Sequence, residues 1–100
     1  MTISTEIMDL WQGHSSSAFP SGFGDRVVEG IDLPLLDAEI TGRIRMFIHA
    51  DGNLDRKQVK VLRERLIDLN SIVLLLNHEE LIYFNRLINL ANLILQVAEG

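Results

Sequence analysis

The hydrophobic pattern is strongest in the last third of the chain, where residues 81–97 read LIYFNRLINLANLILQV. Arg86 is the only charged residue in this run. Four amides supply most of its other polar positions: Asn85, Asn89, Asn92 and Gln96. Because they are spaced by four, three and four positions, they fall on one stripe of a helix. The pattern predicts a helix over residues 78–98 that is buried around most of its circumference. The amides would form either a solvated stripe or a ladder that fixes register in an oligomer.

Two earlier segments also have helical periodicity. Residues 34–49 follow Asp32, a favourable N-cap, and end before an Asp-Gly turn signal. Residues 55–76 begin with Asp55 and Gln58, which are spaced as in a capping box. Apolar residues in this second segment follow a three-four heptad spacing: Val59, Leu62, Leu66, Leu69, Val73 and Leu76. Both segments are therefore predicted to be helices with one face toward a core.

The boundary between the second and third helices depends on Asn77. Asparagine is a favourable N-cap, and Glu79 and Glu80 follow in the first turn, where acids suit the helix dipole. However, neither Gly nor Pro separates the two segments, and the heptad pattern runs on beyond the boundary. The sequence therefore favours a helical hairpin, with one continuous helix over residues 55–98 as the alternative.

The first third of the chain is less regular. Residues 3–12 have apolar side chains at helical spacing, which predicts a short helix. Residues 13–31 are rich in Gly and Ser and contain a Pro, a composition typical of a loop or an extended arm. We therefore divide the chain into a short helix and flexible arm, residues 1–31, and a helical domain, residues 32–100.

Together these elements predict an all-α fold, a helical hairpin or three-helix unit with an N-terminal arm. Two helices that are apolar on nearly all sides cannot both be hidden in a three-helix monomer, so we expect a homodimer that completes the bundle. The candidate interface residues are Leu66, Leu69, Val73, Leu76, Phe84, Leu87, Ala91 and Ile94. A membrane span is not expected, because the amides and Arg86 would be costly in lipid.

Charge is distributed unevenly along the chain, whose net charge is −5. Residues 43–65 hold seven bases and three acids, whereas residues 1–42 hold seven acids and one base. Three bases of the middle segment fall on one stripe of a helix, which could meet phosphates or the protein's own acids. The candidate partner-binding residues are this stripe and aromatic residues of the N-terminal third: Trp11, Phe19, Phe23, Arg56, Lys60 and Arg63.

Motifs that would indicate catalysis or metal binding are missing from the sequence. The absence of cysteine excludes disulfides and thiolate metal sites. The Asp-Gly turn resembles part of a calcium-binding EF-hand loop, but with Gly52 at the central position the first and last ligand positions are held by Phe47 and Gln58. The histidines lie far apart and lack metal-ligand spacing: His14, His49 and His78. We therefore assign no catalytic residue, no cofactor and no metal ligand.

These features favour a non-enzymatic, oligomeric interaction or regulatory protein. The N-terminus is unlike a signal or transit peptide, and the lack of cysteine fits a reducing compartment, so we expect a cytoplasmic protein. Two alternatives remain. One is a nucleic-acid-binding helical protein that uses the basic stripe of residues 43–65. The other is a small helical enzyme or ligand-binding bundle with a site at the subunit interface.

Overall fold

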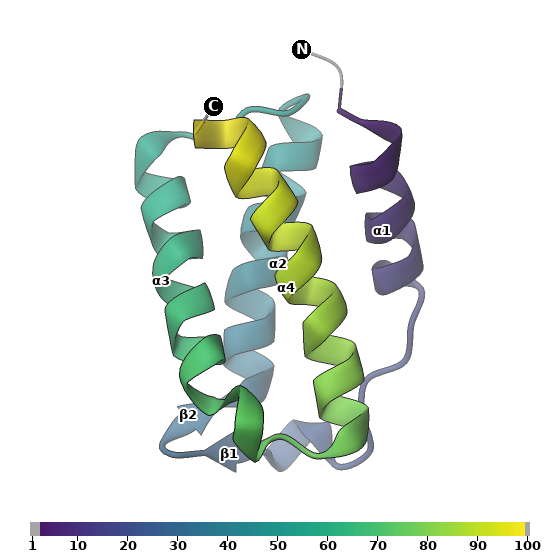
Figure 1. Cartoon of the computed structure of the whole chain (residues 1–100), viewed down its shortest axis with the longest axis vertical. Coiled ribbons are helices and arrows are strands. Elements are labelled where there is room, and N and C mark those ends of the chain that lie inside the picture. The colour runs from purple at the N-terminus through teal and green to yellow at the C-terminus, as the bar shows by residue number, and fades with distance from the viewer. Residues whose placement is uncertain (1–2, 100) are drawn as a thin grey trace.

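The computed structural model describes residues 3–99 and shows a helical bundle with a small β-ribbon (Figure 1). The elements follow in chain order as α1 (Thr5–Ser15), η1 (Phe23–Asp25), β1 (Val27–Val28), β2 (Ile31–Asp32), α2 (Leu33–His49), α3 (Arg56–Ile72), η2 (Val73–Leu75) and α4 (His78–Glu99). Figure 1 shows α4 between α3 and α1, with α2 behind it. The prediction of a mostly helical chain is confirmed, and the β1–β2 ribbon is an addition to it.

Short polar side chains start each of the four α-helices. Asp32 and Asp55 accept backbone N–H groups in the first turns of α2 and α3, at 3.0 and 2.8 Å. Asn77 accepts the backbone N–H of Glu80 at 2.9 Å, and the Glu80 carboxylate accepts the Asn77 N–H at 2.9 Å, which completes a capping box for α4. Ser4 caps α1 in the same way. These local bonds explain why α2, α3 and α4 begin within one residue of the predicted starts, whereas α1 begins at Thr5 rather than at residue 3.

The chain reverses direction between α3 and α4, so the hairpin prediction is confirmed and the continuous helix is excluded. The helix α3 ends at Ile72, and η2 follows as a single tighter turn. Leu76 then has extended backbone angles, φ −77° and ψ 145°, which end the helical path before α4 begins. The heptad pattern continues across this break because both helices face the same core.

The hydrophobic core lies within the single chain and draws on all four α-helices. Six of the residues predicted for a dimer interface are buried in this core: Leu66, Leu69, Phe84, Leu87, Ala91 and Ile94. The chain's own helices cover these side chains. This is possible because α1 and α2 pack on sides of α4 for which the sequence analysis identified no covering segment within the chain. The other two predicted residues, Val73 and Leu76, remain half-buried.

Residues 13–31 lie against the helices rather than forming a free arm. Glu29 and Gly30 have positive φ angles of 51° and 77° and form the two-residue turn that joins β1 to β2. Phe23 and Val28 are buried in the same core as the helices. This segment therefore belongs to the helical unit, because it contributes to the same hydrophobic core.

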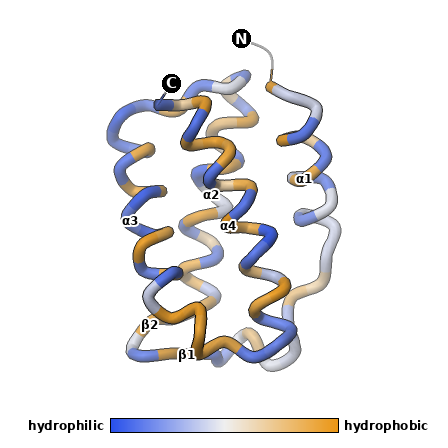
Figure 2. Tube along the Cα trace, viewed as in Figure 1, coloured by the Kyte–Doolittle hydropathy of each residue, from blue (hydrophilic) through white to orange (hydrophobic). Residues whose placement is uncertain are grey.

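The helix α4 is the central helix of the bundle, and its amide stripe faces solvent. All four amides are exposed, and Figure 2 shows hydrophilic and hydrophobic positions alternating along this helix. By length and composition alone α4 could also cross a membrane, a test that the core helix of a soluble fold passes as well. Eight of its residues are buried in the bundle. The amide stripe thus lies on the exposed side of a helix whose other side is buried in the core.

Candidate functional site

A groove lies where the N-terminal half of α3 meets the C-terminal end of α4, and its volume is about 1110 Å³. We call it the basic groove, and it is lined by Leu54, Arg56, Lys57, Val59, Lys60, Arg63, Ala98 and Glu99. The structure thus brings together the three bases of the predicted stripe. Lys57 joins them in the groove, although the sequence analysis did not single it out.

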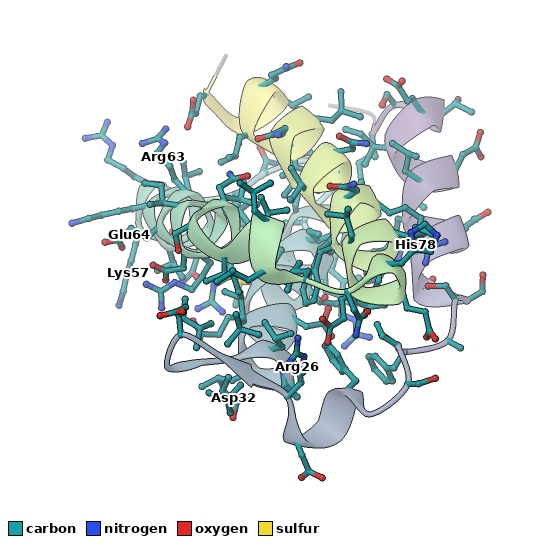
Figure 3. All side chains as sticks on the ribbon, turned by 60° about the horizontal axis from the view of Figure 1, so that its bottom comes forward. Arg26, Asp32, Lys57, Arg63, Glu64 and His78 are labelled. Atoms are coloured by element: carbon teal, nitrogen blue, oxygen red, sulfur yellow. The ribbon has the colours of Figure 1, made fainter. Side chains whose placement is uncertain are left out.

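The bases of the basic groove differ in how they are paired. Arg63 forms an ion pair with Glu99. Within residues 3–99, the other three bases, Arg56, Lys57 and Lys60, make no ion pair. Figure 3 shows Arg63 and Lys57 on different sides of α3. The groove therefore carries positive charge that the described part of the chain does not neutralise.

The remaining bases of residues 43–65 lie elsewhere on the molecule. Arg43 donates to the side-chain oxygen of Gln58 at 3.1 Å. Arg65 forms ion pairs with one acid of α2 and one of α3, at 3.3 and 3.2 Å. Arg45 lies over an aromatic ring of α1, 5.7 Å from its centroid. The predicted basic segment is therefore divided among several places, and the basic groove holds its largest group.

A second hollow of about 310 Å³ lies between the C-terminal end of α1, the helix α2 and the start of α4. We call it the aromatic pocket, and it is lined by Trp11, His14, Ser15, Ser17, Phe19, Asp37, Ala38, Thr41, Arg45 and Tyr83. Two of the aromatic residues predicted to bind a partner, Trp11 and Phe19, thus meet in one place. The third, Phe23, is buried in the core, with its ring stacked on that of Phe19 at a centroid distance of 5.4 Å.

Three polar side chains are buried in the wall of the aromatic pocket: His14, Asp37 and Tyr83. The Tyr83 hydroxyl donates to Oδ1 of Asp37 at 3.0 Å, and Thr41 donates to the same oxygen at 3.3 Å. The His14 ring lies 4.7 Å from that of Tyr83, measured between centroids. Its Nδ1 is buried and has no hydrogen-bond partner among residues 3–99.

Burial determines the charge of this polar cluster. It raises the pKa of the Asp37 carboxyl, despite opposing hydrogen bonds from two hydroxyls and the charge of Arg45. Burial lowers the pKa of His14, and the charge of Arg86 lowers it further, so the imidazole is neutral at neutral pH. The pKa of Tyr83 is raised by burial and by Asp37, so its hydroxyl stays protonated and able to donate.

An ion pair between a partly exposed arginine and a buried glutamate joins the residue before β1 to α4. Arg26 donates to both carboxylate oxygens of Glu80, at 2.7 and 3.3 Å, and the Glu80 side chain is fully buried. Burial by itself would raise the pKa of Glu80. The hydrogen bonds from Arg26 and from the Asn77 backbone, together with the Arg26 charge, outweigh burial and lower that pKa. The N-terminal segment is therefore anchored at the first turn of α4.

The sequence analysis did not identify Asp37 and Glu80 as buried acids with distant partners, although each leaves a signal in the sequence. Asp37 and Glu80 are charged residues at core-facing positions of apolar helix patterns. Their partners are distant in sequence, because Tyr83 is 46 residues from Asp37 and Arg26 is 54 residues from Glu80. An acid on an apolar face can thus be found by inspection, whereas its partner cannot.

The other two histidines, His49 and His78, are exposed, and Figure 3 labels His78 on the first turn of α4. Across residues 3–99, no group of three acids or histidines is placed to hold a metal ion. Comparisons of the chain with models of protein families, with curated proteins and with solved structures found no match. The basic groove and the aromatic pocket are therefore the features from which we infer function.

Proposed function

We propose that this is a non-enzymatic interaction protein that binds an acidic, partly apolar segment of a partner protein in the basic groove. The main support is the cluster of four bases in one groove, three of which have no ion pair within residues 3–99. The same groove contains apolar surface from Leu54, Val59 and Ala98. A peptide segment with both carboxylates and aliphatic side chains complements this lining.

Phosphates would be attracted by the same bases, but the lining of the groove favours a peptide over nucleic acid. The lining includes no aromatic side chain on which a base could stack. The net charge of −5 also opposes long-range attraction of a polyanion to the whole chain.

Lys60 gives the most direct test of the basic groove. We expect Lys60→Glu to weaken the binding of an acidic peptide about tenfold, because it replaces an attracting charge by a repelling one. The probe is a fluorescently labelled peptide of alternating Glu and Leu, and its affinity is measured by fluorescence anisotropy. The affinity should fall as salt is added, because exposed charges are screened.

Arg86→Glu is the matched control, because it makes the same charge change at an exposed position on α4 outside the groove. We expect this variant to bind the peptide within about twofold of the original protein. An equal loss in both variants would mean that net charge, rather than the groove, controls binding. Tighter binding of a DNA duplex than of the peptide would favour the nucleic-acid alternative.

We also propose that the protein self-associates through the corner formed by the end of α3 and η2. This corner holds the two predicted interface residues that stay half-buried, Val73 and Leu76. Leu74, between them in sequence, is 95% exposed, and Leu75 is 52% exposed. A twofold dimer would bury this aliphatic surface against its own copy.

Light scattering after size exclusion tests this association. We expect the original protein to have the mass of a dimer and Leu74→Glu to have the mass of a monomer with unchanged helicity, because a charge at the contact cannot be desolvated. Leu35→Glu is the control, since Leu35 is a 56% exposed leucine on α2 and should leave the mass unchanged. A monomeric mass of the original protein at all concentrations would contradict the proposal.

A further inference from the structure

The aromatic pocket presents mainly hydrogen-bond acceptors. Each hydroxyl in its lining already donates its proton to another group of the chain. The bonds run from Ser15 to the Gln12 carbonyl, from Ser17 to the His14 carbonyl, and from Thr41 and Tyr83 to Asp37. The oxygen lone pairs of these hydroxyls are what remains for a ligand. Trp11 and Arg45 also line the pocket and carry donors, but they lie against each other, so a ligand that reaches the hydroxyls and Asp37 must itself bring hydrogen-bond donors.

The buried polar cluster adds a further acceptor. Both hydrogen bonds to Asp37 reach Oδ1, and within residues 3–99 no group donates to its Oδ2. The His14 ring is neutral, but its Nδ1 has almost no accessible surface, so a ligand in the pocket does not reach that atom. Asp37 is more than nine-tenths buried, so it gains from a ligand that supplies an N–H group.

The walls of the pocket suit a positive charge. The rings of His14 and Phe19 lie 4.7 and 6.0 Å from that of Tyr83, so aromatic surface surrounds the acceptors. Trp11 also lines the pocket, and the Arg45 guanidinium lies 5.7 Å from the centroid of its ring. Aromatic faces attract ammonium and guanidinium groups through their quadrupole.

We propose that the aromatic pocket binds an alkylammonium group, which donates to Asp37 while its charge rests against the aromatic walls. The volume of about 310 Å³ is at the lower end of the range for small-molecule sites, which fits a small amine. The group can belong to a free amine or to a lysine side chain. This site is independent of the basic groove, because Tyr83 and Ala98 lie near opposite ends of α4.

Trp11 provides the measurement, because it is the single tryptophan of the chain and lines the pocket. The probe is n-butylammonium, titrated against the full chain and followed by tryptophan fluorescence, with n-butanol and butyrate as neutral and anionic matches. We expect a saturable change with n-butylammonium at millimolar concentration and none with the other two. Absence of saturation with n-butylammonium, or equal saturation with butyrate, overturns the proposal.

Two variants locate the binding. Asp37→Asn should weaken the affinity for n-butylammonium at least about tenfold, because it removes the charge that pairs with the ligand. Arg45→Gln should tighten it about threefold, because a competing cation leaves the Trp11 face. Unchanged affinity in folded Asp37→Asn overturns the proposal. If circular dichroism shows that Asp37→Asn is unfolded, the exposed Arg45→Gln decides, and unchanged or weaker binding in that variant overturns it.

A second ligand distinguishes the two sources of the ammonium group. Nα-acetyl-lysine N-methylamide carries the same butylammonium chain attached to a peptide backbone. Binding as tight as that of n-butylammonium supports the pocket as a site for a lysine of another protein. Binding of n-butylammonium together with exclusion of the lysine derivative supports it as a site for a free amine, since the pocket mouth would then reject the backbone.

Discussion

Replacing Phe84 by alanine is expected to lower the free energy of unfolding by about 4 kcal/mol. Phe84 has no exposed surface, and its ring lies 5.9 Å from that of Phe23 and 5.2 Å, edge-on, from that of Tyr83. Truncation would remove these contacts and leave a cavity at the place where α4 meets the N-terminal segment. Urea denaturation followed by circular dichroism gives the value directly.

Phe19→Ala is the matched control, because it removes the same side chain from a position that is 65% exposed. We expect this change to cost less than about 1 kcal/mol. A comparable loss at the two positions would contradict the placement of the core inside the chain. A second result would also contradict this placement: Phe84→Ala lowers the mass in solution but leaves the free energy of unfolding unchanged. Phe84 would then belong to an interface between subunits.

Replacing Glu80 by alanine is expected to lower the free energy of unfolding by about 3 kcal/mol. The substitution removes both hydrogen bonds from Arg26 and the bond that satisfies the Asn77 N–H at the start of α4. One side chain therefore supports two separate features, the helix cap and the attachment of the β-ribbon. Thermal and urea unfolding of the variant measure the loss.

The Glu80 pair also predicts a pH dependence. Because the pKa of Glu80 is lower in the folded chain than its ordinary value of 4.5, its contribution is complete at neutral pH and is lost as pH falls through the folded-state pKa. Glu80→Gln should therefore be less stable than the original protein at neutral pH, and the difference should shrink in acid. Unfolding curves recorded across the acid range test this sign.

Glu79→Ala is the control for both Glu80 experiments. Glu79 is the neighbouring acid, is exposed, and accepts hydrogen bonds from Ser21 at 2.9 and 3.3 Å. We expect Glu79→Ala to lower the free energy of unfolding by no more than about 1 kcal/mol, because water can replace an exposed hydrogen bond. Similar losses for Glu79→Ala and Glu80→Ala would mean that burial of the ion pair contributes little.

The contribution of Asp37 to stability depends on pH in the opposite direction to that of Glu80. Burial raises its pKa in the folded chain, so ionised Asp37 opposes folding at neutral pH, and its contribution becomes favourable as pH falls. The pKa values of the two buried acids are therefore shifted in opposite directions. Glu80 has a cation bonded to both oxygens, whereas within residues 3–99 only hydroxyls bond to Asp37. An unbalanced buried carboxyl of this kind is what an incoming ammonium group would neutralise.

Local patterns in the sequence were enough to predict the helices and their starts. Asp32, Asp55 and Asn77 each cap a helix through a bond to a residue three positions away, and such bonds depend on neighbouring residues alone. The same holds for the stripe of Arg56, Lys60 and Arg63, which the structure keeps together in one groove because helical spacing places them there.

The tertiary structure decided what covers each apolar face and which buried acids find partners. Phe84 and Leu87 look like interface residues in the sequence, and they became core residues because α1 and α2 pack onto α4. Asp37 meets Tyr83, and Glu80 meets Arg26, across 46 and 54 residues of chain. Periodicity states which face of a helix is buried, but not which segment lies against it. That choice depends on how all the elements fill space together, so these contacts appear only when the whole chain is folded.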